Sequence, residues 1–213
     1  MSKQQLIFLF KAIEHKLLIK NNHKGEPSSM ATKAKTQEII PTKNVWVGDS
    51  QASVALVEFG DYESEACAKA NEIVKKLIKQ FEGQLKFNFR HFPLTQIHQR
   101  AQKAAEAAVG AAQEGKFWEM HNLLFENRKS LGTISLKMYS KEAGISNKKF
   151  LDALVNSTYS WEVRNDLLEG LSKGVRDVPT FFINGQILLG KPSYENIKNA
   201  IEAQLKQTHK KRA

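Results

Sequence analysis

The residues with the clearest chemical potential lie between positions 58 and 67. Cys67 is the only cysteine of the chain, and Ser64 stands three positions before it. A thiolate can attack a disulfide, but dithiol exchange needs a second thiol that resolves the mixed disulfide. A serine hydroxyl cannot replace a thiol here, because its pKa lies far above neutrality and the sequence places no base to activate it. Glu58 is a third candidate, since a carboxylate within an apolar run is costly unless it is paired or protonated.

A strand, a sharp turn and a helix must position these three residues. The apolar run Val54–Phe59 predicts a strand that is buried on both faces. Apolar residues then recur at steps of three and four from Ala66 to Phe81, which predicts a helix. We expect Ser64 to be the N-cap of this helix and Cys67 to lie in its first turn, at the third helical position.

Two interpretations of Cys67 and two of Ser64 stay open at this point. The positive end of the helix lowers the pKa of a thiol, whereas burial and the neighbouring Glu63 and Glu65 oppose this effect, so we expect a slow thiol. Cys67 is then either a small buried hydrophobic residue or a single thiol that forms mixed disulfides. Ser64 is either a structural N-cap or a hydroxyl that orients a bound thiol such as glutathione.

The chain continues with a second strand and then changes character. Leu85–Arg90 alternates with period two, and a strand, a helix and a strand of these lengths form a right-handed unit with parallel strands. From residue 96 to residue 173 the patterns are helical. The part from about 96 to 157 is predicted to be an all-helical insertion, in which Ser135 and Ser146 cap two of the helices.

The strands resume near the C-terminus in a β-hairpin. Its strands are Thr180–Ile183 and Gln186–Leu189, and Asn184–Gly185 between them is the strongest short-range signal for a hairpin turn. Ser193 is expected to cap a closing helix. The predicted order is therefore β-α-β, a helical block, α, β-hairpin, α, which is an α/β fold with an inserted helical block.

The net positive charge comes almost entirely from the two ends of the chain. The net charge is +10, of which residues 1–43 carry +5 and residues 204–213 carry +4, so the part between them is nearly neutral. We expect a domain of residues 44–206 between a disordered extension (1–43) and a basic tail (207–213), which are solvated or adhere weakly to an anionic surface. Translation is predicted to start at Met30 rather than at the first residue.

Two features predict a cytoplasmic location. A single cysteine excludes an internal disulfide framework, which favours a reducing compartment. The apolar stretch Leu6–Phe10 is interrupted by Lys11 and is too short for a membrane span or for the core of a signal peptide. Because no other apolar run approaches the length of a membrane span, we expect no membrane insertion.

Four motifs, taken in their order along the chain, carry a resemblance to a known family. They are Val57–Tyr62, Arg90–Leu94, Gly115–His121 and Val178–Gly185. With these motifs the chain from about Val45 to Leu205 resembles the DsbA-like thiol-disulfide oxidoreductases. The resemblance implies a thioredoxin-like fold with a helical insertion.

The resemblance also implies roles for particular residues. In the family the helix opens with C-x-x-C, and the two cysteine positions align with Ser64 and Cys67, so the attacking thiol is absent. A family carboxylate that lies below the cysteine pair and assists proton movement aligns with Glu58. The cis-proline of the family aligns with Pro179, which leaves the main chain of Val178 able to pair with an extended peptide.

Two functions agree with these residues. The first is a peptide-binding or thiol-ligand-binding protein that has lost dithiol exchange, and the second is a monothiol or glutathione-dependent oxidoreductase or transferase that uses Cys67 or Ser64. A purely structural partner of another protein is a third. The expected partner is an extended peptide or a protein that carries a thiol or disulfide, with glutathione as the one candidate small ligand and no resident cofactor. The residues expected to bind the ligand are Glu65, Ala66, Val178, Pro179 and Thr180.

The sequence predicts neither a metal site nor nucleic-acid binding. The spacings of His91, His98 and His121 fit no standard zinc pattern, and we expect satisfied histidines at helix ends or on the surface. There is no glycine-rich phosphate loop and no motif that interleaves aromatic and basic residues.

Overall fold

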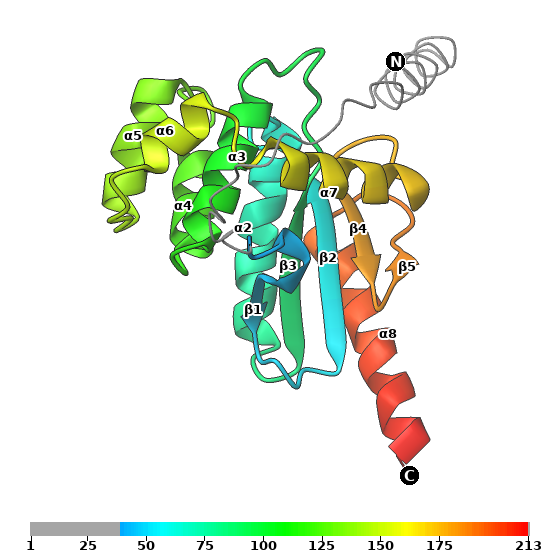
Figure 1. Ribbon diagram of the computed structural model, residues 1–213. Helices are drawn as coiled ribbons and strands as arrows, with labels where there is room; N and C mark the ends of the chain where they lie inside the picture. The colour runs from blue at the N-terminus through cyan, green and yellow to red at the C-terminus, as the bar shows by residue number, and fades with distance from the viewer. Residues whose placement is uncertain (1–38, 213) are drawn as a thin grey trace, which may run out of the picture. The chain divides into compact units, whose positions relative to one another are not determined.

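The fold is organised around a five-stranded mixed sheet with the strand order β1-β3-β2-β4-β5 (Figure 1). The computed structural model describes residues 39–212, so the predicted start at Met30 and most of the predicted extension lie outside the described residues. β2 and β3 are parallel, whereas β1, β4 and β5 each run antiparallel to a neighbour. The strands are β1 (Trp46–Gly48), β2 (Val54–Gly60), β3 (Leu85–His91), β4 (Thr180–Ile183) and β5 (Gln186–Ile187).

Helices cover both faces of this sheet. α2 and α8 lie side by side on one face, and α7 crosses the other face (Figure 1). α3, α4, α5 and α6 form the predicted helical block between β3 and α7. The helices are η1 (Thr42–Asn44), α2 (Glu65–Gln80), α3 (Ala101–Ala112), α4 (Phe117–Glu126), α5 (Thr133–Glu142), α6 (Phe150–Val155), α7 (Ser160–Ser172) and α8 (Tyr194–Arg212).

The predicted strand, helix and strand unit is confirmed as β2-α2-β3. Val54 and Leu56 are fully buried, as the apolar run predicts for a central strand. The register pairs Val54 with Leu85 and Gly60 with His91 over the whole length of both strands. The predicted α/β fold with a thioredoxin-like order of elements is therefore correct.

Several boundaries differ from the sequence pattern. The predicted caps Ser135 and Ser146 are wrong, because α5 begins after Gly132 and α6 begins at Phe150. The Ser146 hydroxyl instead donates a hydrogen bond of 3.0 Å to the Glu114 carboxylate. β5 is shorter than the predicted strand, and α8 continues through residues 207–212.

The helical block packs closely because α3 is rich in alanine. Nearly every residue of α3 is buried, and small side chains allow neighbouring helices to approach it. At Gly110 the approach is closest, because a Cβ atom there would lie 2.9 Å from the Phe150 ring and 3.0 Å from the Tyr159 ring. The helical block is thus closely packed where α3 meets Phe150 and Tyr159.

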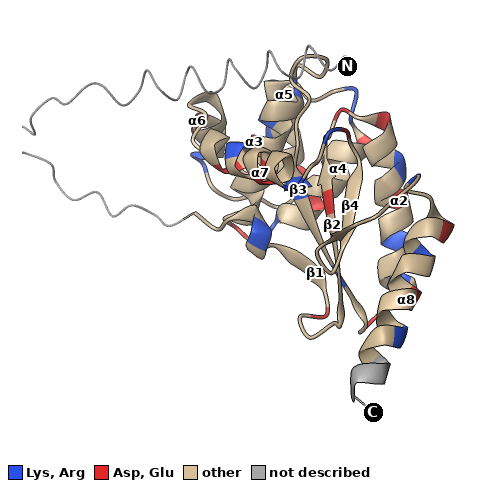
Figure 2. Cartoon of the chain, turned by 90° about the vertical axis from the view of Figure 1, so that its right-hand side faces the viewer, with Lys and Arg blue, Asp and Glu red and all other residues tan. Residues whose placement is uncertain are grey.

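The outer faces of α2 and α8 are solvated. Figure 2 shows basic and acidic residue positions, coloured blue and red, along both helices. Several of these charges form exposed pairs one helical turn apart, such as Glu65 with Lys69. Within residues 39–212, no helix combines the length and the apolar character that crossing a bilayer requires.

Candidate functional site

Ser64 begins the helix that carries the candidate thiol. Its backbone is extended, and its side-chain oxygen accepts a hydrogen bond of 3.3 Å from the backbone N–H of Cys67. The predicted N-cap is therefore confirmed. Because this oxygen is occupied as an acceptor and Ser64 is buried, the hydroxyl has no arrangement in the described structure that activates it as a nucleophile.

Cys67 lies beneath the first turn of α2 and is fully buried. Its sulfur accepts a hydrogen bond of 3.4 Å from the backbone N–H of Asp61. Burial, followed by the nearby charge of Glu58, raises the pKa of the Cys67 thiol well above its ordinary value, despite the hydrogen bonds from this turn. The thiol is therefore protonated at neutral pH, and its slow reactivity stays a prediction.

Glu58 faces the same side of the sheet as α2. Successive side chains of a strand point to opposite faces of the sheet. The next residue of β2, Phe59, packs against Gly170 of α7, so Glu58 points to the other face. Glu58 is buried, and within residues 39–212 its Oε1 atom has no hydrogen-bond partner. Burial raises the pKa of this carboxyl well above its ordinary value, so the neutral acid is favoured.

Val178, Pro179 and Thr180 reach the same end of the sheet. The register pairs Thr180 with Phe59, one residue before the end of β2, and the Val178–Pro179 peptide bond is cis. The backbone N–H of Val178 donates a hydrogen bond of 2.8 Å to the Asp177 carboxylate. The Val178 carbonyl accepts no hydrogen bond from the described residues.

The two remaining residues of the predicted site, Glu65 and Ala66, are exposed at the start of α2. The Glu65 carboxylate lies 2.7 Å from Lys69 and 3.5 Å from Arg128, and the Lys69 ammonium lowers the pKa of that carboxyl. Local chain order thus places Ser64, Cys67 and Glu58 around one turn. The sheet register adds the segment 178–180 at the same end.

Asp61 is a central residue of this turn that the sequence does not single out. Its buried carboxylate accepts hydrogen bonds from the backbone N–H of Glu63 (2.7 Å) and of Leu94 (2.8 Å), and lies 2.9 Å from Nδ1 of His98. Its own N–H contacts the Cys67 sulfur. Asp61 therefore joins the start of α2 to the loop after β3. The turn signal at Gly60–Asp61 indicates a bend but not these partners.

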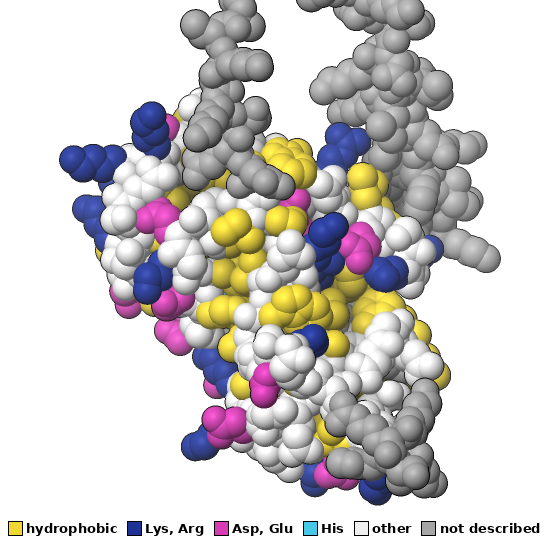
Figure 3. All heavy atoms as spheres, turned by 60° about the horizontal axis from the view of Figure 1, so that its bottom comes forward, with side chains coloured by type: hydrophobic (Ala, Val, Ile, Leu, Met, Phe, Trp, Pro, Cys, Tyr) yellow, Lys and Arg dark blue, Asp and Glu magenta, His cyan; other side chains and the backbone are white. Residues whose placement is uncertain are grey.

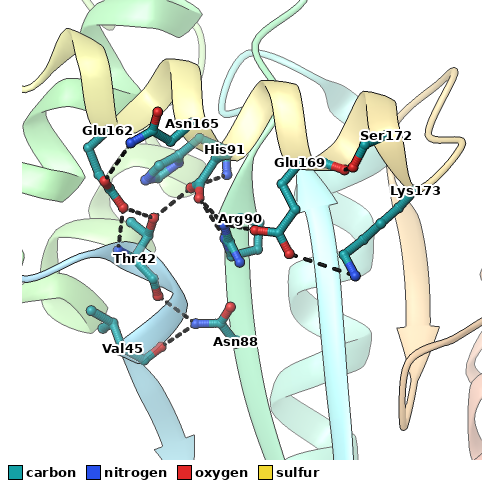
Figure 4. A network of polar contacts seen from close by, with 11 residues as sticks. Thr42, Val45, Asn88, Arg90, His91, Glu162, Asn165, Glu169, Ser172 and Lys173 are labelled. Atoms are coloured by element: carbon teal, nitrogen blue, oxygen red, sulfur yellow. Dashed lines mark hydrogen bonds and ion pairs between the residues drawn. The ribbon is translucent and has the colours of Figure 1, made fainter.

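A buried polar network holds the end of β3 against α7 (Figure 4). Asp166 accepts hydrogen bonds from Nε of Arg90 (2.6 Å), from the backbone N–H of His91 (3.0 Å) and from the hydroxyl of Thr42 (2.7 Å). Arg90 also reaches Glu169 at 2.5 Å. Thr42 is fully buried, so the ordered body includes this residue, which precedes the predicted domain boundary at 44.

The predicted surface or helix-end location is wrong for His91 and His121, which are both buried, whereas the prediction of satisfied ring nitrogens is wrong for His91 and correct for His121. Within the described chain neither ring nitrogen of His91 has a partner, and burial, with the Arg90 charge, lowers its pKa to about 3. His121 contacts the Tyr62 hydroxyl at 3.1 Å and the Asn71 side chain at 3.2 Å. The two imidazoles pack among the aromatic rings of the core.

A family model described as thioredoxin matches residues 41–203. The chain belongs to the thioredoxin family. Oxidised BdbD from Bacillus subtilis is 27% identical, with a TM-score of 0.70 over 76% of this chain and 92% of that chain. The thiol-disulfide exchange protein α-DsbA2 from Wolbachia pipientis is 20% identical, with a TM-score of 0.64 over 74% of this chain and 85% of that chain. The DsbA-like thioredoxin fold implied by the sequence is thus confirmed.

Curated relatives of this thioredoxin-family chain are longer proteins. The Na(+)/H(+) antiporter NhaA 3 of Salinispora tropica is 32% identical over 163 residues, which cover 76% of this chain and 25% of the antiporter. The chain therefore spans about a quarter of the length of such relatives. The similarity concerns the thioredoxin-like part of the sequence and establishes no antiporter activity for this chain.

Proposed function

We propose that this thioredoxin-fold protein binds an extended peptide or a thiol ligand at the start of α2 and does not carry out dithiol exchange. One observation carries the proposal. At the helix start the chain has Ser64, which the sequence resemblance aligns with a family cysteine, and its single thiol, Cys67, is buried and protonated. A fold built for thiol exchange thus retains its architecture without the pair of thiols that exchange requires.

The geometry supports binding by main-chain contacts. The carbonyl of Val178 is available to accept an N–H group from a peptide, while Asp177 occupies the N–H of Val178. The first turn of α2 is exposed at Glu65 and Ala66, where its positive dipole end faces the ligand. The Ser64 hydroxyl oxygen accepts a hydrogen bond from the backbone N–H of Cys67. The hydroxyl hydrogen can therefore be donated to a sulfur or a carbonyl oxygen of the ligand.

The test is an NMR titration of the labelled protein with reduced glutathione and, separately, with an unstructured peptide without cysteine. We expect saturable shifts of the backbone amides of residues 64–67 and 178–180. Ala66→Trp should block binding, whereas Lys69→Trp, at an exposed position one turn along α2, should not. Saturable binding that Ala66→Trp leaves unchanged would contradict the proposed site.

A glutathione-dependent oxidoreductase or transferase is the second candidate function. It is favoured by the Ser64 hydroxyl, which lies at the helix start beside the Cys67 backbone and could orient a glutathione thiol. In this case the wild type turns over glutathione-coupled substrates. Loss of that turnover in Ser64→Ala or Cys67→Ala would identify the residue that handles the sulfur.

The antiporter relatives suggest a partner for such a module. Because the matched part is only a quarter of each antiporter, we propose that this domain works beside a membrane-bound cation antiporter. Reciprocal co-purification with an antiporter of the same cell tests this, and reproducible absence from the antiporter complex argues against it. The cytoplasmic location remains a prediction, for which cell fractionation is the direct measurement.

A further inference from the structure

A pocket of about 220 Å³ opens between α2, α4 and β1, on the side of α2 away from α8. Figure 3 shows hydrophobic side chains gathered in a band, bordered by charged ones, on the end of the molecule that points down in Figure 1. The walls of the pocket are mostly apolar and aromatic. Its lining residues are Val47, Asn71, Val74, Lys75, Ile78, Phe87, Trp118, His121 and Asn122.

The polar groups of this pocket are built into the core. Asn71 and His121 are more than nine-tenths buried. Burial lowers the pKa of His121 well below its ordinary value, so the ring is neutral and carries one N–H. The Tyr62 hydroxyl donates to Nδ1 of His121, which leaves the proton on Nε2, and Nε2–H donates to Oδ1 of Asn71.

This chain of hydrogen bonds fixes the orientation of Asn71. Its oxygen is committed to His121, and its amide nitrogen has no partner among the described residues. A second donor, the Lys75 ammonium, stands at the rim, where exposed carboxylates of Glu72 and Glu126 lie at 3.0 and 3.9 Å. The ammonium donates a hydrogen bond to Glu72, whereas the 3.9 Å contact with Glu126 is too long for one, so Lys75 keeps further N–H groups for another acceptor. The pocket therefore offers donors to an incoming acceptor group.

We infer that this pocket binds a small monocarboxylate with an aromatic or branched apolar body. The carboxylate accepts from the Asn71 amide and faces the Lys75 ammonium, and the apolar body lies against Phe87 and the Trp118 ring. The volume is below the range of about 300–1,000 Å³ for drug-sized sites, so the ligand is small. The site lies apart from Ser64 and Val178, and its occupancy does not depend on the proposed peptide function.

The experiment is an NMR titration of the full chain with benzoate, benzamide and benzylamine, which share a ring and differ in charge. Benzoate should shift the side-chain amide signal of Asn71 in a saturable way and show cross-relaxation with the rings of Phe87 and Trp118. Benzamide should bind more weakly, and benzylamine, which brings donors and a positive charge, should not bind. No saturable shift with benzoate, or equal affinity for benzylamine, overturns the inference.

Three variants locate the binding. Ile78→Phe fills the pocket and should weaken benzoate binding at least about tenfold, whereas Ile73→Phe, at a half-buried position of α2 outside the lining, should stay within about twofold. Asn71→Asp keeps an oxygen for His121 and removes the amide donor, so it should also weaken binding at least about tenfold. Unchanged affinity in Ile78→Phe or Asn71→Asp would contradict the site. If these variants do not fold, the presence or absence of cross-relaxation between benzoate and the rings of Phe87 and Trp118 in the wild type decides whether the pocket is the binding site.

Discussion

The buried network around Asp166 provides a quantitative test of how the scaffold is held. Arg90→Met removes the cation that contacts Asp166 at 2.5 Å and Glu169 at 2.5 Å, with Arg90 only 7% and Asp166 0% exposed in their side chains. Asp166 would keep its hydrogen bonds from Thr42 and His91 but would lose its counter-ion. Breaking a buried pair by removing one partner costs about 3–5 kcal/mol.

The assay is urea and thermal unfolding at pH 7.5 and pH 4.5. For a chain of this size, a loss of 3–5 kcal/mol lowers the Tm by about 6–20 °C. Burial already raises the pKa of the Asp166 carboxyl above its ordinary value although the Arg90 charge lowers it, so without Arg90 this pKa rises further. The destabilisation is then fully present above the raised folded-state pKa, shrinks as the pH falls through it and disappears below the unfolded-state pKa, so it should be smaller at pH 4.5.

Lys173→Met is the matched control, because Lys173 contacts Glu169 at 3.8 Å with 45% of its side chain exposed. It should change the free energy of unfolding by no more than about 1 kcal/mol. A loss of unfolding free energy below about 1 kcal/mol in Arg90→Met, or a loss that is the same at both pH values, would contradict the stabilising role of this buried ion-pair network.

Further substitutions test the candidate site. Ser64→Ala removes the hydrogen bond to the Cys67 N–H and should cost about 1 kcal/mol of stability in urea unfolding, and no loss would argue against the cap. Cys67 should react with iodoacetamide at least about a hundredfold more slowly in the native protein than in urea, because the thiol is buried; equal rates would contradict this burial. Glu58→Gln should raise the Tm at pH 7.5 but not at pH 4.5, since the raised pKa of Glu58 makes its ionisation costly only above the unfolded-state pKa; a gain at both pH values would point to another cause.

The elements around the candidate site were predictable because their signals are local. The apolar run of β2, the helical spacing of α2 and the Asn184–Gly185 turn each depend on a few neighbouring residues. The N-cap at Ser64 and the burial of Cys67 follow from the same short segment. Such signals survive in the folded chain when tertiary contacts agree with them.

The parts that the sequence did not predict depend on residues far apart in the chain. Asp61 meets His98 after 37 positions, and Arg90 meets Asp166 after 76. The hydrophobic periodicity of the sequence does not indicate such long-range pairs, because each partner is an ordinary polar residue in its own segment. β1 is too short for its three residues to show a strand pattern, and it forms only because β3 offers an edge to pair with.

The helical block shows a related limit. Ser135 and Ser146 are residue types that favour N-caps, but α5 begins after Gly132 and α6 begins after Lys149, so residue type alone does not locate the helix starts. His91 and His121 are polar residues, yet their rings pack among Tyr62, Phe89 and Phe117 in the core. Burial of a histidine is a tertiary property that a single sequence does not reveal.

The central claim is that an oxygen at position 64 separates this scaffold from dithiol exchange. Glutathione-coupled reduction of a disulfide substrate by the wild type, Ser64→Cys and Cys67→Ala tests it most directly. The account predicts turnover by Ser64→Cys alone. Turnover by the wild type that disappears in Cys67→Ala, or a folded Ser64→Cys protein without turnover, would contradict it.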